Sequence, residues 1–411
     1  MKKCCFVILL LSLKFMSTAQ DKHSFPASLL YEKGSAGLLH ILDNPDTFRY
    51  QLIYTQIDRD KNNKPHFTHY KIRVNRDEYF NPASMVKMPL AFLALEKLHD
   101  IKGVTKDTPM LTDSAFSGQT SVNADAGAAN GLPSIGHYIK KIFLVSDNDA
   151  YNRLYEFLGQ QYINETLWKK GYPDIRITRR FTPMSEEENR HTNPVRFIEN
   201  DSLIYRQPAA YSKLQFTFPK EIQLGRAHYN RDEELVLSPM DFTRHNNAPL
   251  EDLQQIMQSV LFPASVKAKS RFGLDQDDYS MLYRVMSQMP SESRHPVYDT
   301  TEYFDSYTKF FMFKADRTIP SYMRVFNKTG WSYGFLTDVA YIVDFKNNIE
   351  FMLSGVIYVN SDGILNDDKY EYKEIGYPFF KETGDIFYHY ELQRKRKFIP
   401  DLSGFRIDYK E

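Results

Sequence analysis

The chain has 411 residues, of which 42% are hydrophobic and 25% are charged. This balance is typical of a globular protein that is long enough to bury a core in two lobes. Lys plus Arg (52) equals Asp plus Glu (52), so no excess charge favours nucleic acid or an anionic membrane as a partner. Any selectivity for charged ligands must therefore be local.

The N-terminus has the pattern of an export signal. A basic start at residues 2–3 is followed by an apolar run at 4–13 and by small residues at 17–19. We expect residues 1–20 to be a signal peptide that is cleaved near Ala19 or Gln20, which would release a periplasmic or secreted protein. No later stretch reaches the roughly 20 uncharged residues of a membrane-spanning helix, so no membrane span is predicted.

The chain contains 2 cysteines, and both lie in this leader, at Cys4 and Cys5. The mature protein then has no thiol for a disulfide, a nucleophile or a zinc ligand. We expect catalysis by oxygen and nitrogen groups, without a metal ion or a cofactor.

The predicted elements begin with a β-hairpin, because polar and apolar residues alternate at 49–58 and again at 66–75. A helix is expected to begin near Pro82 and to run through Leu98. Helical patterning over 133–158 is interrupted at residues 146–148, whose types favour turns and helix caps.

In the second half, Ser238 and Pro239 predict the start of another helix, with serine as its N-cap and proline in its first turn. Residues 323–328, 338–344 and 349–359 have the patterning of strands. A closing helix is predicted over about 377–394.

Three short motifs follow one another along the chain: Ser84-Met85-Val86-Lys87, Ser146-Asp147-Asn148 and Lys328-Thr329-Gly330. Average residue usage produces a lone Ser-x-x-Lys about once by chance in a chain of this length. Three motifs in order are a much stronger signal. The first opens a predicted helix, the second interrupts one and the third ends a predicted strand.

The first motif fits a nucleophile with its base. Residues three apart on a helix share a face, so Lys87 would lie beside Ser84 and accept its proton if the amine were neutral. Burial and a second cation, Lys328, would both lower the pKa of Lys87. The positive end of the helix dipole would stabilise an oxyanion near Ser84.

The other two motifs fit roles in proton relay and substrate binding. Ser146 could pass a proton to the leaving group, and the amide of Asn148 could hold a substrate carbonyl or amide. Lys328 and the Thr329 hydroxyl are candidates for binding an anionic group of the substrate. Gly330 would let the strand approach the ligand closely.

Together the motifs resemble those of the serine β-lactamase and penicillin-binding protein superfamily, closest to the class A group. The resemblance implies an α/β fold of the α+β type, in which an antiparallel five-stranded sheet is flanked by the terminal helices and carries an inserted all-helical lobe. We expect residues 21–83 and 318–411 to form the sheet lobe and residues 84–317 the helical lobe. The resemblance also makes the backbone N–H of Trp331 the second oxyanion donor.

The chain departs from the family in two places. Ser146 and Lys328 are 182 residues apart, which predicts roughly 70 to 80 extra residues near 198–237 and 275–317. In addition, Thr182 occupies the position of the family's water-activating glutamate. Glu186, Glu187 and Glu188 lie nearby and either replace it or form a solvated loop.

These observations leave three functions open. The first is a serine hydrolase that acts on a lactam, amide or ester through a Ser84 acyl-enzyme. The second is an acyltransferase, in which an alcohol or amine acceptor, for example a bulky amphipathic alcohol, takes the acyl group. The third is a penicillin-binding or penicillin-sensing protein that stays acylated. In each case we expect a monomer with a small-molecule acyl donor and no nucleic-acid partner.

Overall fold

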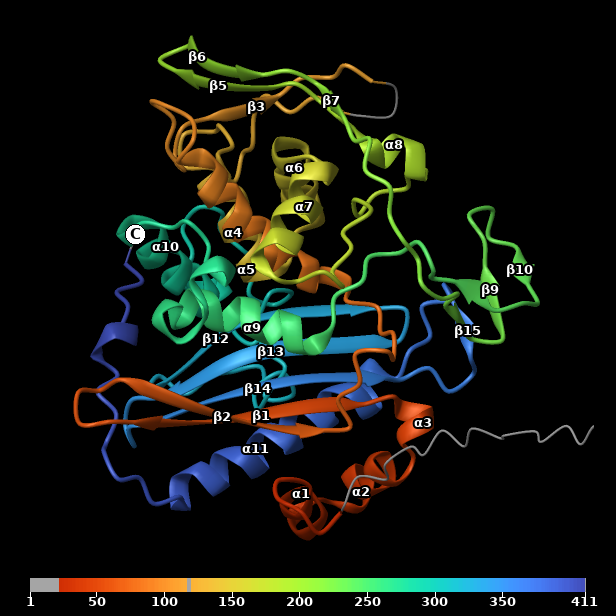
Figure 1. The fold of residues 1–411 in the computed structure, drawn as a ribbon, viewed down its shortest axis with the longest axis vertical. Helices are drawn as coiled ribbons and strands as arrows, with labels where there is room; N and C mark the ends of the chain where they lie inside the picture. Colours follow the sequence, from red (N-terminus) through yellow and green to blue (C-terminus); the bar gives the residue numbers. More distant parts are fainter. Residues whose placement is uncertain (1–21, 117–119, 411) are drawn as a thin grey trace, which may run out of the picture.

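A computed structural model describes residues 22–116 and 120–410. The predicted signal peptide lies outside the described residues. Within the described ranges, no helix is long and apolar enough to cross a membrane. The chain forms a central sheet with helices on both faces (Figure 1).

The central sheet has five antiparallel strands in the order β12-β13-β14-β1-β2. The predicted hairpin is present as β1 (Gln51–Arg59) and β2 (Pro65–Ile72). The end of the chain supplies β12 (Met323–Ser332), β13 (Phe335–Asp344) and β14 (Ile349–Tyr358). β13 is buried along its whole length, because helices cover both faces of the sheet at its middle strands. The expected five-stranded antiparallel sheet is therefore confirmed.

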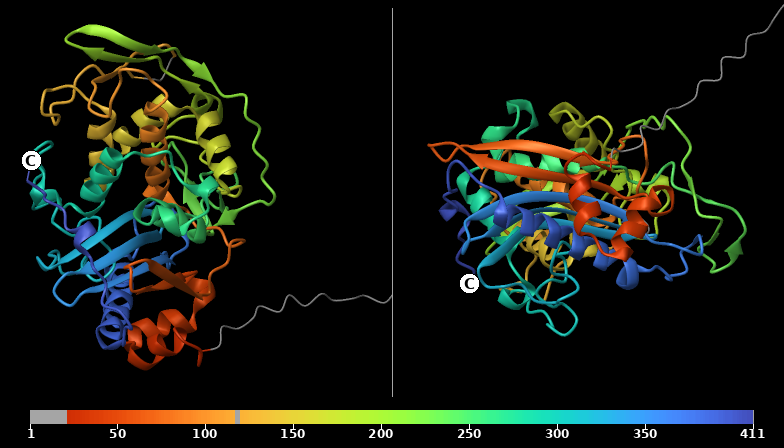
Figure 2. Two further views of the ribbon diagram at one scale, coloured as in Figure 1. Left: turned by 60° about the vertical axis from the view of Figure 1, so that its left-hand side comes forward. Right: turned by 90° about the horizontal axis from the view of Figure 1, so that it is seen from below.

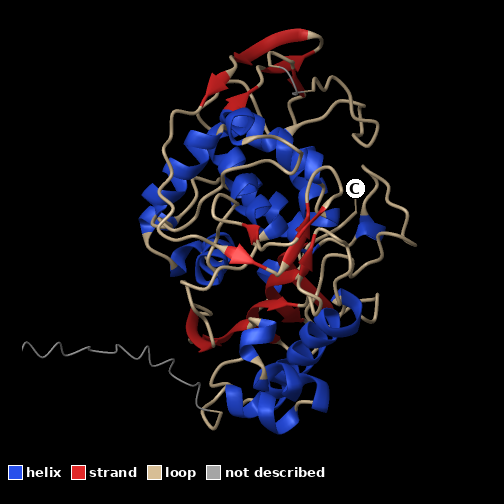
Figure 3. Cartoon of the chain, turned by 90° about the vertical axis from the view of Figure 1, so that its right-hand side faces the viewer, coloured by secondary structure: helices blue, strands red, loops and turns tan. Residues whose placement is uncertain are grey.

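Terminal helices cover one face of this sheet. These are α1 (Ala27–Lys33), α2 (Ala36–Asp43), α3 (Pro45–Phe48) and the closing helix α11 (Tyr377–Gln393). The left view of Figure 2 shows them on the side of the sheet opposite the large helical lobe, and Figure 3 shows the same layers of helices, sheet and helices. α11 contributes Phe379, Phe380 and Phe387 to the apolar core on this side, which explains why the chain ends its sheet lobe with a helix.

The other face carries the helices that position the motifs. They are α4 (Lys87–Leu98), α5 (Ile135–Val145), α6 (Asn148–Leu158), α7 (Gln160–Lys170), α9 (Leu250–Leu261) and α10 (Gln276–Ser287). α4 is buried from Lys87 to Leu95 and runs through the middle of the lobe. A helix enclosed by others in this way is apolar all round, as its sequence is.

The inserted lobe is not all-helical, and this part of the prediction is wrong. β3 (Met110–Thr112), β5 (Val195–Glu199) and β6 (Ser202–Gln207) form a small sheet at the far end of the lobe (Figure 1). Val195 and Phe197 are buried on one face of β5 while Arg196 between them is not. This alternation is the strand signal.

Further short elements complete the lobe and its surroundings. The strands are β4 (His191–Thr192), β7 (Ala210–Tyr211), β8 (Gln223–Leu224), β9 (Ala227–Tyr229), β10 (Leu235–Val236), β11 (Met240–Asp241) and β15 (Ile364–Leu365). The helical pieces are α8 (Glu186–Arg190), the 3-10 turns Ala83–Val86, Pro263–Ser265, Ala268–Ser270, Pro290–Glu292 and Ser403–Phe405, and the π-helical turn Tyr372–Gly376.

The predicted helix start at Ser238 is also wrong. Met240 and Asp241 pair with β8 as the strand β11, and the helix begins twelve residues after Ser238, at Leu250, directly after Pro249. Serine, proline and aspartate favour turns as well as helix caps. Here the turn prevails, and the acidic first turn at Glu251 and Asp252 marks the true start.

Candidate active site

Ser84 lies in the 3-10 turn Ala83–Val86, which leads directly into α4. Ala83 before it has φ 45°, a left-handed conformation that is costly for a residue with a Cβ. The side chain of Asn81 holds this turn, because its Oδ1 accepts a hydrogen bond from the Ala83 N–H at 2.8 Å. Ser84 is partly exposed among buried neighbours, so its hydroxyl lies at the N-terminal end of a buried helix.

Lys87 is completely buried, one helical turn after Ser84. Its amine donates hydrogen bonds to the Ser146 carbonyl, to Asn148 Oδ1 at 2.7 Å and to Ser146 Oγ at 3.4 Å. Burial lowers the pKa of Lys87 well below its usual value and the nearby cation Lys328 lowers it further, while Asp147 opposes the shift. Burial and the second cation therefore favour a neutral amine next to the nucleophile.

Ser146 connects this lysine to the third motif. It ends α5 in a left-handed conformation, with φ 62°, which turns its hydroxyl toward the amine of Lys328 at 2.9 Å. The Ser146 hydroxyl thus lies between two lysine amines. Burial lowers the pKa of Lys328 to about 7, an effect that Asp338 opposes and Lys309 reinforces.

Gly330 brings strand β12 against the nucleophile turn. A Cβ at this position would lie 2.8 Å from the Pro82 carbonyl oxygen and 2.9 Å from the Ser84 nitrogen. Any side chain would therefore force the strand and the turn apart. The predicted glycine role, close approach of the strand to the site, is explained by this contact between backbones.

The structure thus brings together Ser84, Lys87, Ser146, Asn148 and Lys328, which come from three separate regions of the chain. Their catalytic and binding roles remain predictions, as do those of Thr329 and Trp331. The Thr329 hydroxyl is buried and has no hydrogen-bond partner among the described residues. The Trp331 ring packs against Tyr307 and Phe310.

The family model of the β-lactamase enzyme family matches residues 50–213. The chain is therefore similar to the β-lactamase enzyme family over these residues. The match contains the first two motifs and the loop after α7, while the Lys-Thr-Gly motif lies beyond it. The resemblance that the motifs indicate is therefore confirmed.

Solved β-lactamase structures are similar to the chain over most of its length. The enzyme from Burkholderia vietnamiensis is 12% identical, with 90% of this chain and 98% of that chain covered and a TM-score of 0.48. The enzyme from Sphaerobacter thermophilus DSM 20745 is 14% identical, with 87% of this chain and 97% of that chain covered and a TM-score of 0.47. The enzyme from Xanthomonas campestris pv. campestris is 14% identical, with 88% of this chain and 93% of that chain covered and a TM-score of 0.46. No curated protein sequence matches the chain.

Two contacts hold the loop that the motif resemblance assigns to the water-activating glutamate. The buried guanidinium of Arg180 forms an ion pair with Glu156 at 2.8 Å. Asn152 Oδ1 accepts a hydrogen bond from the Phe181 N–H at 2.9 Å. The Phe181 ring centre then lies 5.0 Å from the Lys87 amine. The loop presents an aromatic ring to Lys87, a feature that the sequence analysis missed.

The three candidate replacement glutamates all have other partners. Glu186 pairs with Arg244 at 2.8 Å, and Glu187 pairs with His191 at 3.5 Å. Glu188 accepts hydrogen bonds from the Ser185 backbone and hydroxyl and so caps its own helix, α8. None of the contacts known for these carboxylates in the described chain involves Ser84, Lys87 or Ser146. This favours the solvated-loop interpretation of the acidic run.

A group with metal-ligand geometry, made up of His99, Asp275 and Asp278, occurs away from these motifs, at the start of α10. Asp275 and Asp278 form the reciprocal capping box of that helix, and Asp278 also accepts a hydrogen bond from His99 at 2.6 Å. Helix capping explains the cluster, and it offers no ligand to the Ser84 site.

A cavity of about 690 Å³ borders the Ser84 site. Asn81, Phe181, Thr182 and Ser332 line it. Asn81 holds the nucleophile turn, Phe181 faces Lys87, and Ser332 follows two residues after Gly330. The cavity is therefore the adjoining space in which a bound substrate could extend.

Proposed function

We propose that the protein is an exported serine hydrolase that forms an acyl-enzyme on Ser84 with a lactam, amide or ester. The observation that carries the proposal is the environment of Lys87. This amine is buried, lies next to a second buried amine, and has a pKa well below its usual value. A general base needs an amine that is neutral near pH 7, and this position beside the nucleophile supplies one.

In the proposed acylation, Ser84 Oγ attacks the carbonyl carbon of the donor while its proton moves to the neutral Lys87 amine. The backbone N–H groups of Ser84 and Trp331 stabilise the oxyanion. Ser146 then passes a proton to the leaving group as the scissile bond breaks, since its hydroxyl contacts both lysine amines. Water later attacks the ester, and Ser84 Oγ leaves and regains its proton.

Acyl transfer is a second candidate, and the position of Phe181 favours it. No carboxylate of the described loop contacts Lys87, and an aromatic ring takes the place beside that amine. Without a base for water, the acyl-enzyme lives longer, and an alcohol or amine acceptor can take the acyl group instead. A protein with no such acceptor would remain acylated and act as a penicillin-binding protein.

The test is a time course of the intact mass of the mature protein with a penicillin, a cephalosporin and p-nitrophenyl acetate. Each donor is used with and without an added alcohol, and Ser84→Ala is the control. An adduct that forms and decays in water alone supports the hydrolase, and one that decays only with the alcohol supports the transferase. An adduct that persists in both supports the penicillin-binding protein. Labelling of Ser84→Ala would refute the nucleophile.

A further inference from the structure

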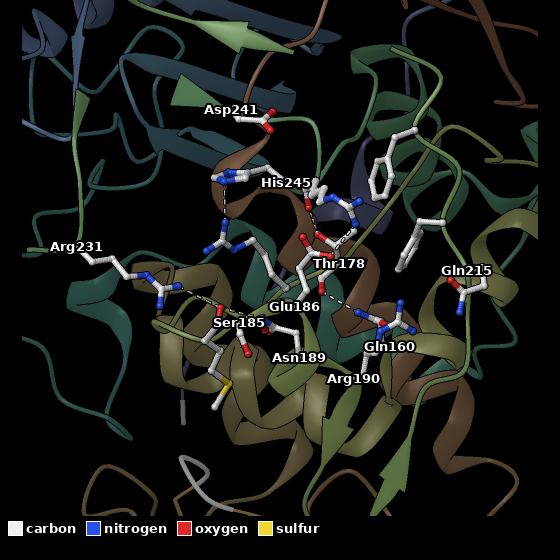
Figure 4. A pocket seen from close by; sticks show the side chains of 15 residues that line it. Gln160, Thr178, Ser185, Glu186, Asn189, Arg190, Gln215, Arg231, Asp241 and His245 are labelled. Atoms are coloured by element: carbon white, nitrogen blue, oxygen red, sulfur yellow. Dashed lines mark hydrogen bonds and ion pairs between the residues drawn. The ribbon is translucent and has the colours of Figure 1, made fainter. Parts of the chain in front are cut away.

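The cavity that Asn81, Phe181 and Ser332 line also carries positive charge. Arg179 and Arg231 both line it, together with His245. These three residues and Asp241 also line an adjoining pocket of about 290 Å³. Figure 4 shows that pocket, with the side chains of Arg231 and His245 extending into it. The two spaces therefore meet at the arginines.

Neither arginine forms an ion pair with a carboxylate among the described residues, although Arg231 is close enough to the exposed Glu188 carboxylate to help lower its pKa. The side chain of Arg179 bonds only to His245 Nε2, at 2.8 Å, and that of Arg231 only to the Met184 carbonyl, at 3.4 Å, among the described residues. The described lining of the cavity includes one carboxylate, that of Asp241, which accepts a hydrogen bond from the Thr243 N–H at 2.8 Å. It pairs with neither arginine.

His245 orients Arg179 without cancelling its charge. Burial and the adjacent guanidinium lower the pKa of His245 to about 3, so the imidazole is neutral and accepts a hydrogen bond. An arginine that is held in place by a neutral acceptor keeps its remaining donors and its full charge for an anion. This is the arrangement expected of a binding residue.

The other lining residues of the cavity indicate what kind of molecule would carry the anionic group. Phe181 and Ser332 connect the space to the Ser84 site, and the aromatic residues Tyr229 and Tyr333 line it along the way. A linear, partly apolar chain attached to the reacting carbonyl fits this lining, with its charged end at the arginines.

Resting on the proposed function, we propose that the site selects acyl donors whose acyl chain ends in a carboxylate, and that Arg179 and Arg231 bind this carboxylate. Both arginines lie outside the three motifs, and Arg231 belongs to the extra residues of this chain. The cavity thus selects donors whose acyl chain ends in a carboxylate, while the motif residues carry out the acylation of Ser84.

The experiment compares pairs of donors that differ only in the terminal group. Mono-p-nitrophenyl adipate and suberate carry a free carboxylate, whereas p-nitrophenyl hexanoate and octanoate have the same chain lengths without it. Second-order acylation rates are measured from p-nitrophenolate release, with Ser84→Ala as the background. The preference is the rate for the diacid ester divided by that for the neutral ester.

We expect the natural protein to prefer the carboxylated ester, and Arg179→Gln and Arg231→Gln each to reduce that preference about 10- to 100-fold, the range for a lost charge-assisted contact. Added salt should also reduce it. Arg206→Gln removes one charge from the exposed strand β6 and should keep the preference. Equal rates for both esters, or an unchanged preference in Arg179→Gln, would overturn the proposal.

A binding measurement separates this proposal from the proposed function. Calorimetry with suberate and the Ser84→Ala protein needs no acylation, so it reports on the arginines alone. Binding that is lost in Ser84→Ala/Arg179→Gln supports the anion site even if no donor labels Ser84. Absence of suberate binding in a folded Ser84→Ala protein would overturn the anion site and leave the nucleophile assignment untouched.

Discussion

Replacing Gly330 with alanine tests whether contact between β12 and the nucleophile turn sets the position of Ser84. The new Cβ would meet three backbone atoms, at 2.8, 2.9 and 3.0 Å, and none of them belongs to a flexible side chain. Restoring an ordinary contact of 3.4 Å from 2.9 Å requires a shift of about 0.5 Å. Since a misplacement of about 1 Å costs about 10²-fold in rate, half of it predicts a loss of about 10-fold or more in acylation.

The assay is the rate of covalent labelling of Gly330→Ala by a penicillin or an activated ester, followed by intact mass. Overpacking should also lower the free energy of unfolding by about 1–3 kcal/mol, so urea unfolding shows whether the variant is folded. Gly404→Ala adds a methyl group where no heavy atom lies within 4 Å and should label at the natural rate. If folded Gly330→Ala labels within twofold of the natural protein, the strand does not position Ser84.

Four further predictions follow from the site. Lys87→Met should slow labelling by about 10² to 10⁴-fold, the usual contribution of a general base to the rate. The control Lys97→Met removes a largely buried amine later on the same helix and should label at the natural rate. Stopped-flow labelling of both folded variants checks this. The labelling rate should rise with pH as Lys87 loses its proton. Binding of anionic donors should weaken above about pH 7 as Lys328 loses its proton. If the Lys328→Ala protein shows the same weakening above pH 7, Lys328 is not the group that titrates. Phe181→Glu places a carboxylate beside Lys87 and should shorten the lifetime of the acyl-enzyme by 10-fold or more, up to the range of about 10² to 10⁴ for base catalysis, as measured by loss of the mass adduct; an unchanged lifetime would show that the missing carboxylate does not limit hydrolysis. Glu156→Gln leaves the buried Arg180 without its ion pair and should reduce the free energy of unfolding in urea by about 3–5 kcal/mol, and a loss below 1 kcal/mol would mean that solvent reaches Arg180.

Much of the fold was predictable because its signals are local. The hairpin, the three late strands and the closing helix each have an alternation or a periodicity that a short window contains. The motif residues Ser84, Lys87, Ser146 and Lys328 were found because each motif also has a local structural role, as a helix start, a helix interruption or part of a strand. The prediction that the third motif ends its strand is wrong, since β12 continues through it to Ser332. The structure brings these residues from three motifs together in one place, as the sequence predicts.

The errors arise where one local signal fits two structures. Ser238 and Pro239 suit a turn as well as a helix cap, and pairing of β11 with β8 decides between them. The same holds for the small sheet at the end of the lobe, where β5 pairs with both β3 and β6. Such pairings depend on partners far away in the sequence, which no window around the strand contains.

The position of Phe181 also depends on residues far away in the sequence, and it matters most for the chemistry of the site. It is set by Asn152 and by the Arg180–Glu156 pair, so neighbouring residues give no sign that an aromatic ring faces Lys87. A carboxylate at this place would hold the Lys87 amine in its charged form, whereas the ring adds to its burial. An aromatic ring at this place therefore favours a neutral base for acylation and supplies no base for water. Rapid formation and slow breakdown of the acyl-enzyme are thus linked through one residue.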